Sequence, residues 1–134
     1  VLVGSLDGAT SPVVPPSRMV YADADLAPDA RFVLPADEPE RAVHVAAGAI
    51  RVGGERFDAG RLLVFRPGDA VAIESLGPAR VMILGGEPLD GPRHLWWNFV
   101  STTEDRIEQA KADWDAERFP SVPGETERIT LPRD

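Results

Sequence analysis

The sequence predicts an all-β fold, a sandwich or barrel of short strands, with one α-helix near the carboxyl end. Thirteen prolines and twelve glycines interrupt short apolar segments at close intervals, which is typical of all-β domains rather than of alternating helices and strands. One segment near the carboxyl end has helical periodicity instead. The 134 residues, of which 43% are hydrophobic, are enough for one ordinary domain with a substantial core.

Eight segments alternate between apolar and polar residues or are short apolar runs, and we predict each to be a strand. Turn sequences such as Gly53-Gly54-Glu55 and Arg66-Pro67-Gly68 separate them. The predicted strands cover residues 18–25, 30–34, 42–46, 49–52, 62–65, 70–74, 79–84 and 95–100. Adjacent strand residues face opposite ways, so we expect only one of Trp96 and Trp97 to enter the barrel interior.

The helix is predicted over about residues 103–117. Ser101 or Thr102 can cap its first turn, and an acidic side chain at 104–105 can complete a capping box near the positive end of the helix dipole. Ile107 and Trp114 fall on one face at helical spacing. We therefore expect this stripe to dock on the sheet or on another domain.

We predict a single domain over residues 1–119 that includes the helix. The prolines and charged residues of 120–134 favour a surface tail with little regular structure. The printed sequence opens without a basic-then-apolar leader and has no cysteine, so we expect a cytoplasmic location.

Composition also limits the classes of partner. A formal net charge of −8 with scattered basic residues disfavours direct binding to DNA or RNA, because phosphate binding depends on clustered lysine and arginine. No apolar run approaches the roughly 20 residues of a membrane-spanning helix. We expect neither nucleic acid nor membrane as a direct partner.

Residues 59–75 have the glycine spacing of a metal-binding turn but contain no histidine. Gly60 and Gly68 are spaced as in the second motif of the cupin superfamily, which this stretch resembles, and Pro67 stands beside the usual proline position. Cupins are small antiparallel jelly rolls that supply metal ligands from inside the barrel. The resemblance implies a double-stranded β-helix, and it places Val71 where the second motif has its histidine.

The first cupin motif has two histidines and a glutamate before a glycine. Counting back from Gly48 puts Arg41 at the glutamate position and Leu34 and Ala36 at the histidine positions. The resemblance therefore places only non-coordinating residues at the four ligand positions. We expect no metal and no other cofactor in this chain.

The two histidines support that expectation without reference to any family. A transition-metal site needs several convergent imidazole, carboxylate or thiolate donors, and His44 and His94 are far apart in sequence. His44 alternates with Val43 and Val45, so we expect it to face away from them as a structural residue. His94 precedes the tryptophan pair and is expected to order a loop or line a groove.

A second and more specific resemblance covers nearly the whole chain. The stretch GGEPLDGPRHLWWNFVSTTEDRIEQAKADWDAERF closely resembles the end of the pirin family. The opening VLVGSLDGATSPV and the following MVYADADLAPDA resemble the beginning of the pirin carboxyl-terminal cupin. Pirins are two-domain cupins whose amino-terminal barrel holds a single non-haem iron and whose carboxyl-terminal barrel has lost its ligands. The resemblance implies that this sequence corresponds to the second barrel alone.

Three functions are compatible with this resemblance. The first is a structural or interaction domain that packs against an iron-bearing cupin through Trp96, Trp97, Ile107 and Trp114. Some pirins are similar to quercetin 2,3-dioxygenases, and an animal member is an iron-dependent nuclear transcriptional coregulator. Both activities belong to the iron-bearing half, so we expect any dioxygenase iron to lie outside this chain.

The second function, and the weakest of the three, is an autonomous enzyme, since no carboxylate pair stands out as an acid-base pair.

The remaining alternative is a binding module for a small organic acid in the vacated barrel, with Arg41 as an anion anchor. Its candidate pocket consists of apolar residues and this arginine: Phe32, Leu34, Ala36, Arg41, Val43, Val71 and Ile73. An arginine inside a barrel is costly without a counter-charge. We therefore expect Arg41 at the solvated barrel mouth, beside the acidic residues of 37–40, with the buried position as the alternative.

Overall fold

The computed structural model describes residues 1–132 and divides the chain into two compact units. The barrel unit is Val1–Pro88, and the carboxyl-terminal unit is Leu89–Asp134. The helix that was expected within a single domain over 1–119 lies in the carboxyl-terminal unit. The division falls at Pro88 and is followed by Leu89-Asp90-Gly91-Pro92, a sequence that interrupts regular structure.

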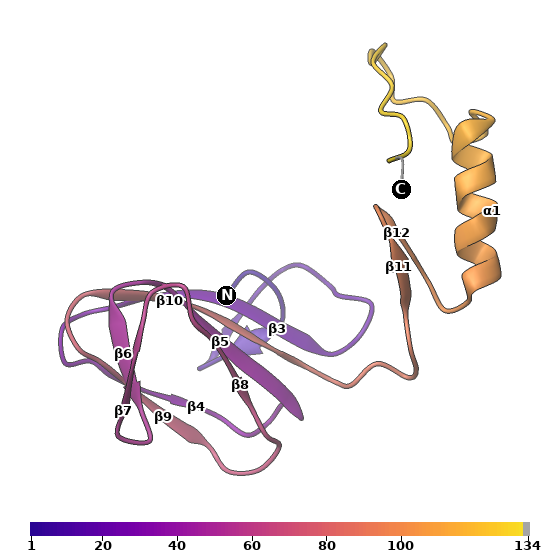
Figure 1. Cartoon of the computed structure of the whole chain (residues 1–134). Helices are drawn as coiled ribbons and strands as arrows, with labels where there is room; N and C mark the ends of the chain where they lie inside the picture. Colours follow the sequence, from indigo (N-terminus) through magenta and orange to yellow (C-terminus); the bar gives the residue numbers. More distant parts are fainter. Residues whose placement is uncertain (133–134) are drawn as a thin grey trace. The chain divides into compact units, whose positions relative to one another are not determined.

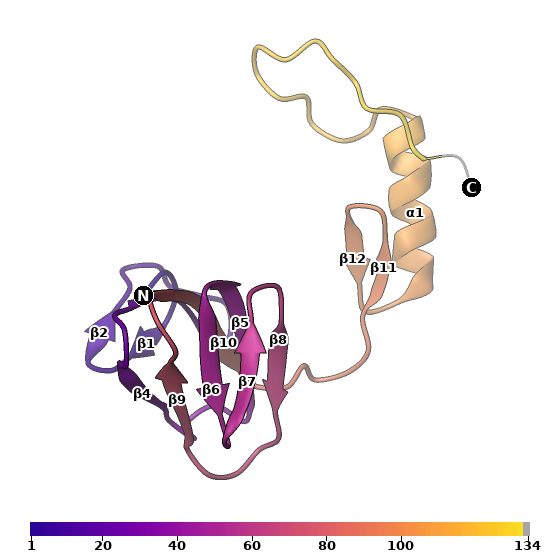
Figure 2. The same cartoon turned by 60° about the vertical axis from the view of Figure 1, so that its left-hand side comes forward.

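The barrel unit consists of two four-stranded antiparallel sheets that face one another (Figures 1 and 2). In spatial order, the first sheet contains β3 (Met19–Leu26), β10 (Ala79–Gly86), β5 (Glu40–Ala47) and β8 (Leu62–Phe65). The second sheet contains β4 (Arg31–Leu34), β9 (Val71–Ser75), β6 (Ala49–Val52) and β7 (Glu55–Asp58). Strands β3 to β6 alternate between the sheets, which is the jelly-roll arrangement, and a short hairpin of β1 (Ser5–Leu6) and β2 (Ala9–Thr10) precedes them.

The all-β prediction with one carboxyl-terminal helix is confirmed, and each of the seven predicted barrel strands overlaps an observed one. Strand β7 was not predicted. Its sequence, ERFD, contains one apolar residue and directly follows two glycines, so it lacks the pattern of a half-buried strand. Pairing with β6 supplies the stabilisation that the local sequence does not.

The core lies between the two sheets. Val43 and Val45 of β5 are 0% exposed, whereas His44 between them is half-buried on the opposite face, as expected from alternation. The most deeply buried side chains come from both sheets: Leu34, Val43, Val45, Ile50, Ile73, Val81 and Ile83. The interior is therefore filled by branched aliphatic side chains.

The carboxyl-terminal unit is a hairpin packed on helix α1 (Glu104–Asp115). The strand predicted over 95–100 is wrong: β11 (His94–Trp96) and β12 (Phe99–Ser101) are separate, because Trp97 has a φ of 50° and forms the turn. The helix is capped by Thr103 without a side-chain hydrogen bond, so the expected capping box is absent. Ser101, which was expected to cap the helix, instead accepts a hydrogen bond from the Thr103 backbone N–H at 3.3 Å.

Residues 120–132 form neither helix nor strand, which agrees with the predicted irregular tail as far as the structure describes it. The tail returns to the helix, because the indole Nε1 of Trp114 donates a hydrogen bond of 2.8 Å to the Ile129 carbonyl. Within residues 1–132, no helix has the length and apolar character needed to span a bilayer.

Gly48 joins β5 to β6 at a crowded point. Its φ is +73°, and a Cβ built on it would lie 2.3 Å from the Pro78 carbonyl oxygen and 2.8 Å from the Ala79 Cα. Both contacts are with backbone atoms, which can move away only if the chain at residues 78–79 is distorted. Gly53, with a φ of +58°, has nothing within 4 Å of the same position.

We expect Gly48→Ala to lower the free energy of unfolding by about 3 kcal/mol, since it combines positive-φ strain with a backbone clash. Gly53→Ala carries only the strain, about 1 kcal/mol. Urea denaturation of the two variants measures the difference. Equal losses would show that the close approach of Gly48 to Pro78 does not exist in solution.

Candidate functional site

The positions that a cupin uses for its metal lie mainly at one end of the barrel unit. Leu34, the last residue of β4, is the cross-strand partner of Val71, the first residue of β9. Arg41 comes from the other sheet and donates a hydrogen bond to the carbonyl oxygen of Pro35, the residue next to Leu34. Ala36 is exposed in the loop that follows. Three of the four positions are thus brought close together, and Ala36 points to solvent.

The Arg41 side chain is buried, with 3% exposure, and its guanidinium binds only backbone oxygens. Nη1 lies 2.8 Å from the Pro35 oxygen, Nη2 lies 3.2 Å from the Arg66 oxygen, and both nitrogens reach the Asp69 oxygen at 3.3 and 3.2 Å. The expectation of a solvated Arg41 is therefore wrong and the buried alternative holds, although Asp37 and Glu38 line the same cavity as Arg41. A planar guanidinium can satisfy several fixed carbonyls at once, which compensates for its burial.

This arrangement does not fit a metal ion. A transition metal requires convergent lone-pair donors, whereas Leu34 and Val71 are apolar and Arg41 carries a fixed positive charge. Within residues 1–132, no group of three histidine, cysteine, aspartate or glutamate side chains is placed to hold a metal. The guanidinium is itself the cation that the loop carbonyls bind.

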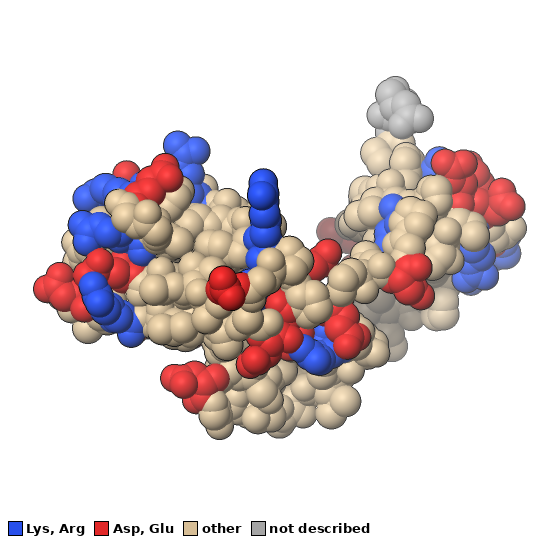
Figure 3. Space-filling model, turned by 90° about the horizontal axis from the view of Figure 1, so that it is seen from below, with Lys and Arg blue, Asp and Glu red and all other residues tan. Residues whose placement is uncertain are grey.

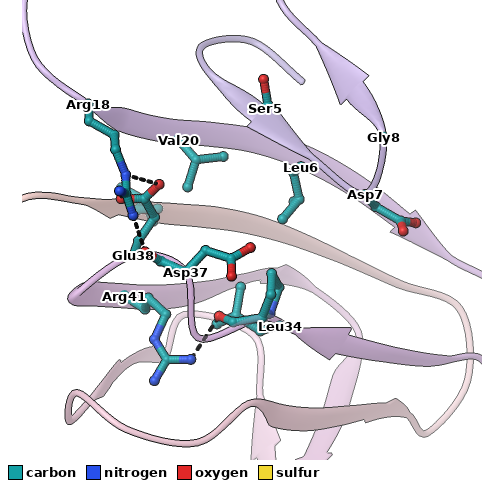
Figure 4. Close-up of a pocket in the computed structure, with 12 residues that line it drawn as sticks. Ser5, Leu6, Asp7, Gly8, Arg18, Val20, Leu34, Asp37, Glu38 and Arg41 are labelled. Atoms are coloured by element: carbon teal, nitrogen blue, oxygen red, sulfur yellow. Dashed lines mark hydrogen bonds and ion pairs between the residues drawn. The ribbon is translucent and has the colours of Figure 1, made fainter.

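A cavity of about 650 Å³ adjoins Arg41 at this end (Figure 4). Figure 4 shows Leu6 and Val20 on one side of it and Leu34 on the other. Arg18 closes part of the rim, because its Nε lies 3.0 Å from Glu38 and its Nη2 donates to the Asp37 carbonyl. The charged residues that line the cavity are Asp7, Arg18, Asp37, Glu38 and Arg41. Three carboxylates against two guanidiniums disfavour an anionic ligand.

Most of the apolar candidate-pocket residues lie away from this cavity. Val43 and Ile73 are 0% and 1% exposed in the core, and Phe32 and Val71 pack against it. Of the candidate set, Leu34 and Arg41 line the cavity, and the barrel interior is occupied by side chains. Sequence alone could not separate a core from a pocket, because both are built from the same alternating apolar residues.

The candidate interface residues Trp96, Trp97, Ile107 and Trp114 all lie in the carboxyl-terminal unit. Ile107 is 5% exposed, so it serves packing rather than an open surface. The aromatic rings form one cluster, with centroids 5.2 Å apart for Trp97 and Trp114 and 6.4 Å apart for Trp96 and Trp97. Because Trp97 forms the hairpin turn and is not part of a strand, the alternation that separated Trp96 from Trp97 in the sequence does not apply to them.

The exposed face of this hairpin was missed by the sequence reasoning. Leu95 and Val100 are cross-strand partners and are 71% and 62% exposed. The signal was the alternation on either side of the turn, which a single long strand had concealed. At the helix end of the hairpin, His94 Nδ1 lies 3.6 Å from a carboxylate oxygen of Glu104, the first residue of α1.

Comparison with known proteins assigns the family. The model of the Pirin C-terminal cupin domain matches residues 21–120 of this chain. The chain belongs to that family. The pirin cupin is 46% identical over 119 residues to a pirin-like protein of Caulobacter vibrioides, a match that covers 89% of this chain and 41% of the relative.

Solved structures show the same fold. A crystal structure of quercetin 2,3-dioxygenase from Acinetobacter baumannii is 31% identical with a TM-score of 0.85, covering 98% of this chain and 46% of that one. A second quercetin 2,3-dioxygenase structure from the same organism has a TM-score of 0.83 at 23% identity, covering 90% of this chain and 43% of that one. The pirin cupin thus spans less than half the length of each of these relatives.

We expect the pirin cupin to bind no stoichiometric metal after exposure to Fe(II), Ni(II) or Zn(II) followed by gel filtration, because its ligand positions lack donors. Elemental analysis of the gel-filtered protein measures the retained metal per chain. One retained equivalent that disappears in His44→Gln or His94→Gln would show a metal site built from other residues.

We expect Arg41→Met to lower the free energy of unfolding by about 2 kcal/mol, since it leaves several partly buried carbonyls without their donor. Amide exchange at 66–70 should also become faster. The control is Arg56→Met, which removes an exposed pair with Asp58 and should change stability by less than about 0.5 kcal/mol. A neutral or stabilising Arg41→Met would mean that the charge costs more than its hydrogen bonds return.

Proposed function

We propose that this pirin cupin is a metal-free interaction domain that packs against an iron-bearing cupin. The observation that carries the proposal is the buried Arg41 guanidinium, hydrogen-bonded to loop carbonyls where a cupin would place its metal. With this cation built in, the barrel has a structural rather than a redox role. The domain then contributes to the larger protein through the surface with which it contacts the iron-bearing cupin.

The length relation supports such a partner. The pirin cupin matches 41% of the Caulobacter relative and 46% of the Acinetobacter dioxygenase, so both relatives contain more than half of their length outside the matched part. If a pirin that contains this domain is a quercetin 2,3-dioxygenase, its iron lies in that other part. We assign no catalytic residue to the present chain.

The carboxyl-terminal unit supplies the first contact surface. It is too small to bury a large core, and units of this size usually need an additional stabilising contact. Leu95 and Val100 project from the hairpin as an exposed apolar pair, on the face opposite the residues that pack on α1. Trp96 and Trp97 remain half-buried at its edge.

Binding of an organic acid is a weaker candidate. The barrel interior is filled by Val43 and Ile73, and the cavity at its mouth carries more carboxylates than guanidiniums. Both terminal nitrogens of Arg41 already donate to carbonyls, so among the described residues only its buried Nε is left without an acceptor.

The proposal is tested by mixing the chain with the iron-loaded part of the Caulobacter relative that lies outside the match. Its fold and iron content are checked first by circular dichroism and elemental analysis. Sedimentation velocity should show a one-to-one complex, and Leu95→Glu should weaken it at least tenfold. The control is Val14→Glu, which changes an exposed valine in the barrel unit. No complex with the wild-type chain would overturn the proposed function.

A further inference from the structure

A second cavity, of about 460 Å³, lies in the carboxyl-terminal unit between the end of α1 and the tail that follows it. We call it the tail cavity. Its lining residues all fall between Trp114 and Ile129, outside the hairpin that the proposed function uses. Its walls are mainly apolar and consist of Trp114, Phe119, Pro120, Val122 and Ile129. Phe119 and Val122 are 43% and 68% exposed, so the cavity is open to solvent.

Hydrogen bonds hold the tail against the helix and so keep the walls in place. The Trp114 indole donates to the Ile129 carbonyl at 2.8 Å. Arg128 Nη2 donates to the carbonyl oxygens of Trp114 and Asp115 at the carboxyl end of α1, and its Nη1 lies 3.2 Å from Glu117. The last turn of α1 has no basic residue of its own, so Arg128 supplies the cation that this end of the helix dipole favours.

The indole of Trp114 is the largest ring in the walls of the tail cavity. Three neighbouring rings, those of Trp97, Phe99 and Phe119, are inclined to it by 59° or more. None of the three therefore lies flat on the indole. The face of an aromatic ring carries partial negative charge and attracts cations, most strongly in tryptophan. An aromatic wall of this kind favours a positively charged ligand over an anionic one.

The charged residues around the tail cavity add to this preference. They are three glutamates, at 117, 125 and 127, and Arg128, which pairs with Glu117. Glu125 accepts the backbone N–H groups of Thr126 and Glu127 at 2.8 Å each, which lowers the pKa of Glu125 and keeps its carboxylate ionised. Among the described residues, neither Glu125 nor Glu127 has a basic partner. Two negative charges are thus left at the cavity.

The rest of the carboxyl-terminal unit has the same character. Residues 89–132 contain nine acidic and five basic side chains, and Figure 3 shows acidic side chains gathered on this unit. Such an excess raises the local concentration of cations. A cation already contacts a tryptophan face here, since Lys111 Nζ lies 4.4 Å from the centroid of the Trp96 ring. Within residues 1–132 no three acidic or histidine side chains are placed to hold a metal ion, so the charge favours an organic cation.

We propose that the tail cavity binds a small organic cation, an ammonium group carried on an aromatic or other apolar body. The body packs on Trp114 and Phe119, and the ammonium group faces the carboxylates of Glu125 and Glu127. A volume of about 460 Å³ lies in the range typical of small-molecule sites. This site goes beyond the proposed function, because it uses other residues and needs no protein partner.

The test uses three ligands that share an indole body and differ in the charge of the head group. They are tryptamine, which is a cation at neutral pH, the neutral alcohol tryptophol, and the anion indole-3-acetate. Calorimetry with the complete chain at low salt should show one-to-one binding of tryptamine. Tryptophol should bind at least about fivefold more weakly, and indole-3-acetate more weakly still. Tryptamine should also shift the indole N–H resonance of Trp114.

Glu127→Gln removes one carboxylate from the rim and leaves the backbone N–H of residue 127 to bind Glu125. It should weaken tryptamine at least about threefold and leave tryptophol unchanged. The control is Asp105→Asn, which removes an exposed carboxylate of the same unit from the first turn of α1, away from the cavity. Both variants should keep the thermal midpoint within about 2 °C.

Four outcomes would overturn the proposal. They are the absence of tryptamine binding, equal or tighter binding of tryptophol or indole-3-acetate, an unchanged Trp114 resonance, and equal losses in Glu127→Gln and Asp105→Asn. The last would show a general effect of charge rather than a site. None of these measurements involves the iron-bearing cupin, so their failure leaves the proposed function as it stands.

Discussion

The hydrogen bonds of the Arg41 guanidinium connect two loops, one between β4 and β5 and the other between β8 and β9. Pro35 follows β4, whereas Arg66 and Asp69 lie in the loop between β8 and β9, and one side chain from β5 holds all three carbonyls. The pairing of Leu34 with Val71 lies at the same end, so Arg41 of the first sheet is joined to the second sheet near the point where β4 and β9 pair. A metal-binding cupin would close this end with imidazoles and an ion. Here one amino acid supplies both the charge and the fixed geometry.

Because aliphatic side chains fill the barrel interior, the side chains that are free to contact other molecules lie on the surface. The outer side of the second sheet carries the charged row Arg31, Glu74, Arg51 and Arg56. The outer side of the first sheet carries the apolar row Tyr21, Leu84, Ala42 and Val64. In the carboxyl-terminal unit, the hairpin carries the exposed pair Leu95 and Val100. The aromatic cluster around Trp114 stiffens that hairpin, since edge-to-face ring contacts fix its orientation on α1.

The sequence predicted the barrel strands β3 to β6 and β8 to β10 well, because these strands depend on local patterns. The absence of a metal stays a prediction. Alternation around His44 and the motif glycines Gly60 and Gly68 are visible without a structure. The burial of Arg41 was only the alternative expectation, since it depends on carbonyls of a loop 25 and 28 residues away. The hairpin turn at Trp97 was missed because a bulky residue seldom adopts positive φ. The apolar row on the outer side of the first sheet could not be predicted from the sequence either, because cross-strand neighbours are known only when the register is known.

The chemistry of Arg41 also determines what the barrel does not depend on. A guanidinium remains protonated throughout the physiological range, cannot be exchanged for another ion and has no second oxidation state. Proteins closed by a metal lose stability when the metal is removed, because binding and folding free energy are shared. This barrel has no such dependence at the end that Arg41 closes. The contacts that close this end therefore come from the chain itself and form together with the fold, whatever the supply of metal ions.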